Sequence, residues 1–67
     1  MEYAKTSKEV TQEARRRARD GSARVITKNF GKFNILLADD FIGTKEKANE
    51  AYLVEPRGRV HFLGAKI

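Results

Sequence analysis

With 67 residues, a net charge of +5 and no cysteine, the chain is a small basic protein. This length allows a single domain, covering residues 1–67, and the lack of cysteine excludes a disulfide framework and a thiolate zinc site. No apolar run is long enough for a signal peptide or a membrane span, so we expect a cytoplasmic protein that does not bind a membrane.

The charge is unevenly distributed along the chain. Residues 21–37 hold three basic and no acidic side chains, whereas residues 38–50 have a net charge of −2. The rest of the chain is basic. This distribution favours a polyanion or an acidic protein surface as the partner, with one acidic segment of its own.

The first element is predicted to be a helix over residues 8–20. Thr6 and Glu9 have the spacing of a capping box, with Ser7 as a competing cap, and Gly21 is the expected left-handed stop. The apolar stripe is thin and consists of small side chains, so close packing on a sheet must support the helix. Its members, four residues apart, are Val10, Ala14 and Ala18.

Two β-hairpins are predicted to follow. Residues 23–28 and 33–39 form the first, with Asn29 and Gly31 in the turn. Residues 51–55 and 59–64 form the second, and Pro56 and Gly58 suit the second and fourth positions of a type I turn. Between the hairpins, Thr44 could cap a short helix over residues 45–51, although no capping box is completed there.

The predicted fold is therefore α+β, with one N-terminal helix packed on a small antiparallel sheet of about four strands and a short second helix. The alternation of side chains in residues 23–28 predicts a half-exposed strand. Residues 33–39 are apolar on both sides, which indicates a central strand or one covered by a second subunit. We predict a homodimer formed over Leu36 or along an exposed strand edge.

Arginines crowd the end of the predicted helix. Glu13 precedes Arg16 and Arg17 by three and four residues, an order that favours ion pairing. This leaves Arg15 and Arg19 as a narrow face towards solvent, able to contact phosphates or an acidic protein. The alternative is a purely structural one, because cations in a last turn complement the helix dipole.

The two hairpin tips are also basic. Arg57 and Arg59 flank the second turn and could follow a phosphate backbone or simply aid solubility. At the first tip, Lys28 and Lys32 surround Phe30. An exposed aromatic in this position can stack on a base or anchor a protein interface, unless it folds back to cover the core.

Catalytic and metal-binding patterns are poor. His61 has no sequence neighbour that identifies an acid–base partner. Asp39 and Asp40 would point to opposite sides of a strand, so ending the strand or forming an Asx turn is favoured over metal binding. The glycines match neither a P-loop nor a dinucleotide fingerprint. We expect no catalytic site, no metal and no cofactor.

Two functions remain. The first is a non-enzymatic protein that docks on a larger protein with an acidic surface and modulates or inhibits it, of the type that phages and mobile elements often encode. The second is a basic nucleic-acid-binding module. The second would use the arginines and the two lysines of the contact residues. The internal pairing of Arg16 and Arg17 and the lack of a nucleic-acid-binding motif favour the first. The contact residues are Arg15, Arg19, Lys28, Phe30, Lys32, Arg57 and Arg59.

Overall fold

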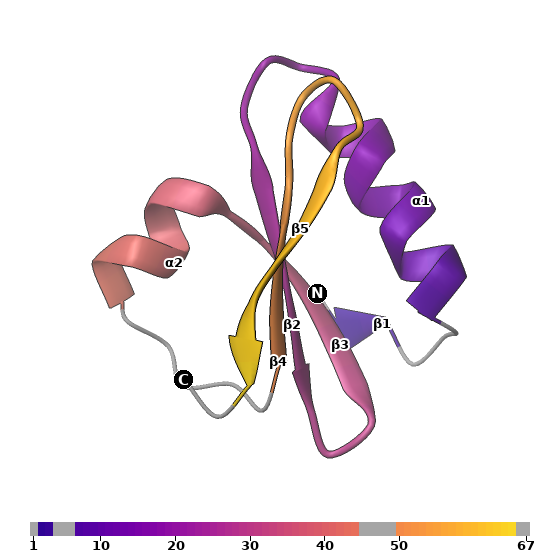
Figure 1. The fold of residues 1–67 in the computed structure, drawn as a ribbon, viewed down its shortest axis with the longest axis vertical. Coiled ribbons are helices and arrows are strands. Elements are labelled where there is room, and N and C mark those ends of the chain that lie inside the picture. Colours follow the sequence, from indigo (N-terminus) through magenta and orange to yellow (C-terminus); the bar gives the residue numbers. More distant parts are fainter. Residues whose placement is uncertain (1, 4–6, 45–49, 66–67) are drawn as a thin grey trace.

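A computed structural model describes residues 2–3, 7–44 and 50–65. The predicted α+β class is confirmed: an N-terminal helix packs on an antiparallel sheet, and a second, shorter helix is present (Figure 1). In chain order the elements are β1 (Glu2–Tyr3), α1 (Ser7–Ala18), β2 (Arg24–Asn29), β3 (Lys32–Leu37), α2 (Ala38–Thr44), β4 (Glu50–Val54) and β5 (Val60–Ala65).

The sheet has the strand order β1-β3-β2-β4-β5, and every neighbouring pair is antiparallel. Both predicted hairpins form, as β2–β3 and β4–β5. The two-residue β1 adds to the outer side of β3, where Tyr3 pairs with Phe33. Strand β2 is the central strand, with β3 and β1 on one side and β4 and β5 on the other.

Helix α1 covers one face of the sheet with the predicted stripe. Val10, Ala14 and Ala18 are all buried and pack against Ile26 and Val54 of the sheet. The two alanines let the helix approach the strands closely. The Gly21 N–H donates to the Ala18 carbonyl at 3.0 Å with φ 101° at Gly21, so the predicted left-handed stop ends the helix. The predicted cap Thr6 lies outside the described residues.

Helix α2 lies on the opposite side of the sheet from α1, as Figure 1 shows. The start of α2 corrects one predicted boundary. The strand predicted over 33–39 ends at Leu37, and Asp39 and Asp40 fall in the first turn of α2. Carboxylates are stabilised at a helix N-terminus and disfavoured in strands, so the helix begins before them.

The helix predicted over residues 45–51 is wrong at its C-terminal end, which is the part that the structure describes. Residues 45–49 lie outside the described residues, while Glu50 and Ala51 belong to β4. The prediction that residues 23–28 are half exposed is also wrong. Val25, Ile26 and Thr27 are buried on consecutive positions, because β2 is central and has a helix on each face of the sheet.

Candidate functional site

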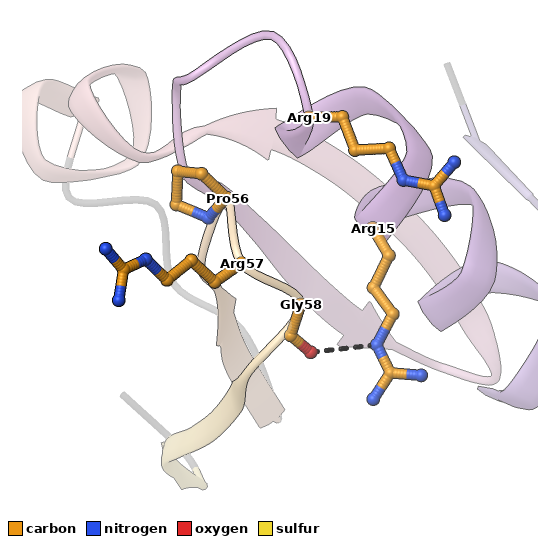
Figure 2. Close-up of a pocket in the computed structure, with 5 residues that line it drawn as sticks. All are labelled: Arg15, Arg19, Pro56, Arg57 and Gly58. Carbon is orange, nitrogen blue, oxygen red and sulfur yellow. Dashed lines mark hydrogen bonds between the residues drawn. The ribbon is translucent and has the colours of Figure 1, made fainter.

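Three of the predicted contact residues line one cleft. Arg15 of α1 and Arg19, which follows the end of that helix, project from the same side, and Arg57 lies on the neighbouring β4–β5 turn (Figure 2). The cleft has a volume of about 320 Å³ and is completed by Pro56 and Gly58 (Figure 2). We call these five residues the arginine cleft.

The β4–β5 turn is held in the predicted form. The Gly58 N–H donates to the Glu55 carbonyl at 2.8 Å, which closes a four-residue turn with Pro56 at its second position. Gly58 has φ 95°, a conformation that favours glycine. The Gly58 carbonyl then accepts a hydrogen bond from Arg15 Nε at 2.9 Å. This bond fixes the turn against α1.

The guanidinium groups of the cleft do not converge on one point. In Figure 2 the Arg57 side chain extends away from α1, on the far side of the turn from Arg15 and Arg19. As the side chains lie, the Arg57 guanidinium points to a different part of the surface from those of Arg15 and Arg19. The arrangement suits an extended anionic surface that offers several separate carboxylates or phosphates.

Other arginines of α1 and its C-terminal loop are neutralised within the chain. Glu13 pairs with Arg16 and also with Arg17, whose Nε lies 2.9 Å from Glu13 Oε2, as the spacing predicts. Arg24 pairs with Asp20 at 2.7 Å. Arg19, Arg57 and Arg59 are exposed, and within residues 2–3, 7–44 and 50–65 none of them has a carboxylate in ion-pair range.

The β2–β3 tip lies at the other end of the sheet. In the β2–β4 ladder Lys28 pairs with Glu50, whereas Arg24 pairs with Val54, next to the arginine cleft. The structure therefore divides the predicted contact residues into two groups: Lys28, Phe30 and Lys32 at one end, and Arg15, Arg19, Arg57 and Arg59 at the other.

Lys28 is partly engaged inside the molecule. Its Nζ lies 4.0 Å from Glu50 Oε2 and 5.5 Å from the centroid of the Phe33 ring. The tip thus has mixed charge, with Lys32 exposed on the neighbouring strand. The other acidic residues of the predicted 38–50 segment that the structure describes, Asp39 and Asp40, lie on α2, on the face of the sheet opposite α1.

Phe30 is the most exposed large apolar side chain of the described residues, at 90%. It does not fold back over the core. Phe30 and Gly31 form a two-residue turn with φ 52° and φ 77°, the pattern of a type I′ hairpin. The first position of that turn normally holds asparagine or aspartate, and left-handed backbone costs other residues about 1–2 kcal/mol. Phe30 therefore combines full exposure with local strain.

Sequence reasoning missed one polar pair. His61 Nε2 contacts Glu55 Oε2 across the β4–β5 hairpin, and both side chains are about two-fifths exposed. The predicted hairpin contains both residues, and the pairing of β4 with β5 brings His61 close to Glu55. Within the described part of the chain, no group of three or more metal-binding side chains occurs. Neither described helix is long and apolar enough to cross a bilayer.

Comparison with known proteins returns no relative: no protein-family model, no curated protein and no solved structure matches the chain.

The ion pairs of α1 and its C-terminal loop predict an acid-sensitive fold. Hydrogen bonds from Arg16 and then Arg17 lower the pKa of Glu13 below its ordinary 4.5, and those from Arg24 and the Ser22 N–H lower the pKa of Asp20 below 3.8. A carboxylate whose pKa is lowered in the folded state stabilises the fold at pH values above its ordinary pKa. This contribution is lost as the pH falls through the folded-state pKa.

Thermal melts followed by circular dichroism should show the melting temperature falling below pH 4.5, and falling less steeply for Glu13→Gln. An unchanged acid slope in that variant would contradict the assignment to Glu13.

Proposed function

We propose that this protein is a non-enzymatic binding protein that docks on a larger protein and modulates or inhibits it. The observation that carries this proposal is Phe30, an aromatic side chain 90% exposed at a hairpin tip in a strained backbone conformation. Strained residues persist where function requires them, and aromatic side chains dominate the binding energy of protein interfaces.

The arginine cleft supports an acidic surface on that partner. Its exposed guanidinium groups are separated from one another, and arginine is a common interface anchor because it forms planar, bidentate bonds with carboxylates. Arg59 follows the cleft in sequence, and Lys32 adds a cation beside Phe30. We propose that both groups of contact residues take part in docking.

The separation of the two groups favours a large partner. They lie at opposite ends of a sheet in a molecule measuring 27 × 26 × 20 Å. A small molecule cannot reach both ends, whereas a protein surface can. The described residues also provide little for catalysis, since His61 contacts only an exposed carboxylate and no nucleophile adjoins the pair.

Nucleic-acid binding is the second candidate, and one observation favours it. The acidic residues Asp39 and Asp40 lie on the face of the sheet opposite α1, so they do not reduce the positive potential of the arginine cleft. Phosphates could occupy that cleft, and Phe30 could stack on an unpaired base. The mixed charge at Lys28 and Glu50 argues against a continuous phosphate track along the sheet.

A salt titration of binding distinguishes the two candidates. For protein docking, Phe30→Ala should abolish capture of one specific protein, while salt should change mainly the association rate. For nucleic-acid binding, Arg57→Ala and Arg59→Ala should each weaken binding to unrelated oligonucleotides by a similar factor, with a steep salt dependence.

Arg16→Ala is the matched control, because Arg16 is paired with Glu13 and removing it takes away one charge outside the cleft. This variant should bind as the wild type does in the protein assay. Tight, steeply salt-dependent binding to oligonucleotides with no captured protein would overturn the docking proposal. Absence of oligonucleotide binding at low salt would overturn the second candidate.

A further inference from the structure

A second hollow lies between the N-terminal half of α1 and the sheet. Its volume is about 180 Å³. On the helix side it is lined by Ser7, Val10 and Thr11, and on the sheet side β2, β3, β4 and β5 each contribute one residue. Among the described residues, these are Ile26, Phe33, Tyr52 and Val60. We call the space between these residues the α1 hollow.

The floor of the α1 hollow belongs to the hydrophobic core. Val10, Ile26 and Phe33 are buried, whereas Ser7 is exposed, so the hollow opens to solvent beside the first turn of α1. Protein interiors are close-packed and contain few voids larger than a water molecule. An apolar hollow of this size in a chain of 67 residues therefore indicates a ligand site.

Aromatic side chains form one side of the α1 hollow. Tyr52 pairs with Ile26 in the β2–β4 ladder and with Phe62 in the β4–β5 ladder, so all three side chains lie on the face of the sheet that α1 covers. The centroid of the Phe62 ring lies 5.3 Å from that of Tyr52, and the two rings are inclined at 50°. Phe62 is 60% exposed and extends this aromatic surface towards solvent. Aromatic rings favour tilted packing, so a further ring in the hollow has a suitable neighbour in Tyr52.

The described lining of the α1 hollow contains no charged side chain, although charged residues make up 34% of the chain. Two of its hydroxyl groups are already hydrogen-bonded, because Thr11 Oγ1 donates to the Ser7 carbonyl at 2.6 Å and the Tyr52 hydroxyl donates to Glu50. The bond to Glu50 raises the pKa of Tyr52 above its ordinary 10.0, so the phenol stays neutral at physiological pH. A charged ligand would lose its hydration without gaining an opposite charge from this lining. Charge complementarity therefore favours a neutral ligand.

The volume of the α1 hollow fits one six-membered aromatic ring. An apolar cavity of about 150 Å³ lined by leucine, isoleucine and phenylalanine side chains stays dry and binds benzene. The α1 hollow, at about 180 Å³, leaves room for such a ring and a small substituent. It is smaller than the pockets of about 300–1,000 Å³ that hold drug-sized ligands. Both comparisons indicate a ligand with a single ring.

We propose that the α1 hollow binds a small neutral aromatic molecule, a benzene ring with one short substituent. The ring packs on Val10, Ile26 and Phe33, beside the tilted ring of Tyr52, and the substituent points to the opening beside Ser7. None of the seven contact residues of the docking proposal belongs to the described lining, so either proposal can fail without the other.

An NMR titration of the full chain with benzyl alcohol tests this proposal. Amide chemical shifts should change saturably, and the changes should centre on the residues of the α1 hollow. Benzylamine has the same ring but is a cation at neutral pH, so it should bind at least about tenfold more weakly. 1-Naphthylmethanol has two fused rings, which exceed the volume of the hollow, and should not bind there.

Filling the α1 hollow by mutation gives a second measurement. Thr11→Phe from the helix side and Val60→Phe from the sheet side each add a ring to it, and each should weaken the binding of benzyl alcohol at least about tenfold. Thr11 is only half-buried, so its variant should fold even if Val60→Phe overpacks the sheet. Leu37→Phe adds the same ring at an exposed position outside the described lining and should bind as the wild type does.

Three results would each overturn the proposal. The first is the absence of saturable shift changes with benzyl alcohol. The second is binding of benzylamine as tight as that of benzyl alcohol. The third is unchanged binding of benzyl alcohol by folded Thr11→Phe, which would place the ligand outside the α1 hollow.

Discussion

Ile26→Ala is expected to destabilise the fold by about 2–5 kcal/mol, because it leaves a cavity at the centre of the core. Ile26 is 2% exposed and lies on the central strand, where it packs under Val10 and Ala14 of α1. A domain of this length has a total stability on the order of 3–10 kcal/mol. The variant should therefore lose a large share of the stability of the fold, as measured by urea titration and thermal melts.

Leu37→Ala is the matched control for that experiment. It is also an aliphatic-to-alanine truncation in the β2–β3 hairpin, but Leu37 is 41% exposed at the end of its strand. Little apolar surface returns to water there, so the loss should stay below about 1 kcal/mol. Equal losses for the two variants would mean that Ile26 is not at the centre of the core.

Phe30→Asn is expected to change stability and binding in opposite directions. Asparagine tolerates left-handed backbone, and Asn-Gly is a preferred type I′ turn, so the variant should gain up to about 1–2 kcal/mol of stability. Losing the exposed ring should weaken docking by at least about 2 kcal/mol, close to thirtyfold, if Phe30 is an interface anchor. Thermal melts and an affinity measurement on the captured protein would record both effects.

Phe30→Ala separates the two causes. Alanine removes the ring but stays strained at φ 52°, so this variant should lose binding without the gain in stability. A Phe30→Asn variant that binds as tightly as the wild type would remove Phe30 from the interface. If the melting temperature of Phe30→Asn did not exceed that of the wild type, the backbone at Phe30 would not be strained.

Much of the fold could be predicted because its signals are local. Val10, Ala14 and Ala18 recur at helical spacing, Gly21 stops the helix, and Pro56 with Gly58 defines a turn. The boundary at Leu37 was missed because the apolar run continues past it, and only the preference of the following aspartates for a helix N-terminus moves it. The strand Glu2–Tyr3 has no local signal, since its register depends on β3.

The residues of the candidate site were easier to predict than their arrangement. The sequence predicts exposed arginines at a helix end and at a turn. Whether they line one cleft depends on how α1 crosses the sheet. The sequence also could not show that Phe30 lies at the far end of the sheet from Arg57, because this depends on how β2 pairs with β4. The exposure of Phe62 was missed because it follows from β5 being an edge strand, which is a property of strand order.

The hydrogen bond from Arg15 to Gly58 joins residues 43 positions apart, so the arginine cleft exists only while α1 is docked on the sheet. An anion that binds the cleft therefore binds the folded state alone, and mass action shifts the unfolding equilibrium by about 2.7 kcal/mol at a concentration one hundred times its dissociation constant. In a domain this small, each kcal/mol raises the melting temperature by roughly 4–8 °C. A rise in melting temperature on adding an anion thus shows that the anion occupies the cleft, and this measurement does not require the biological partner.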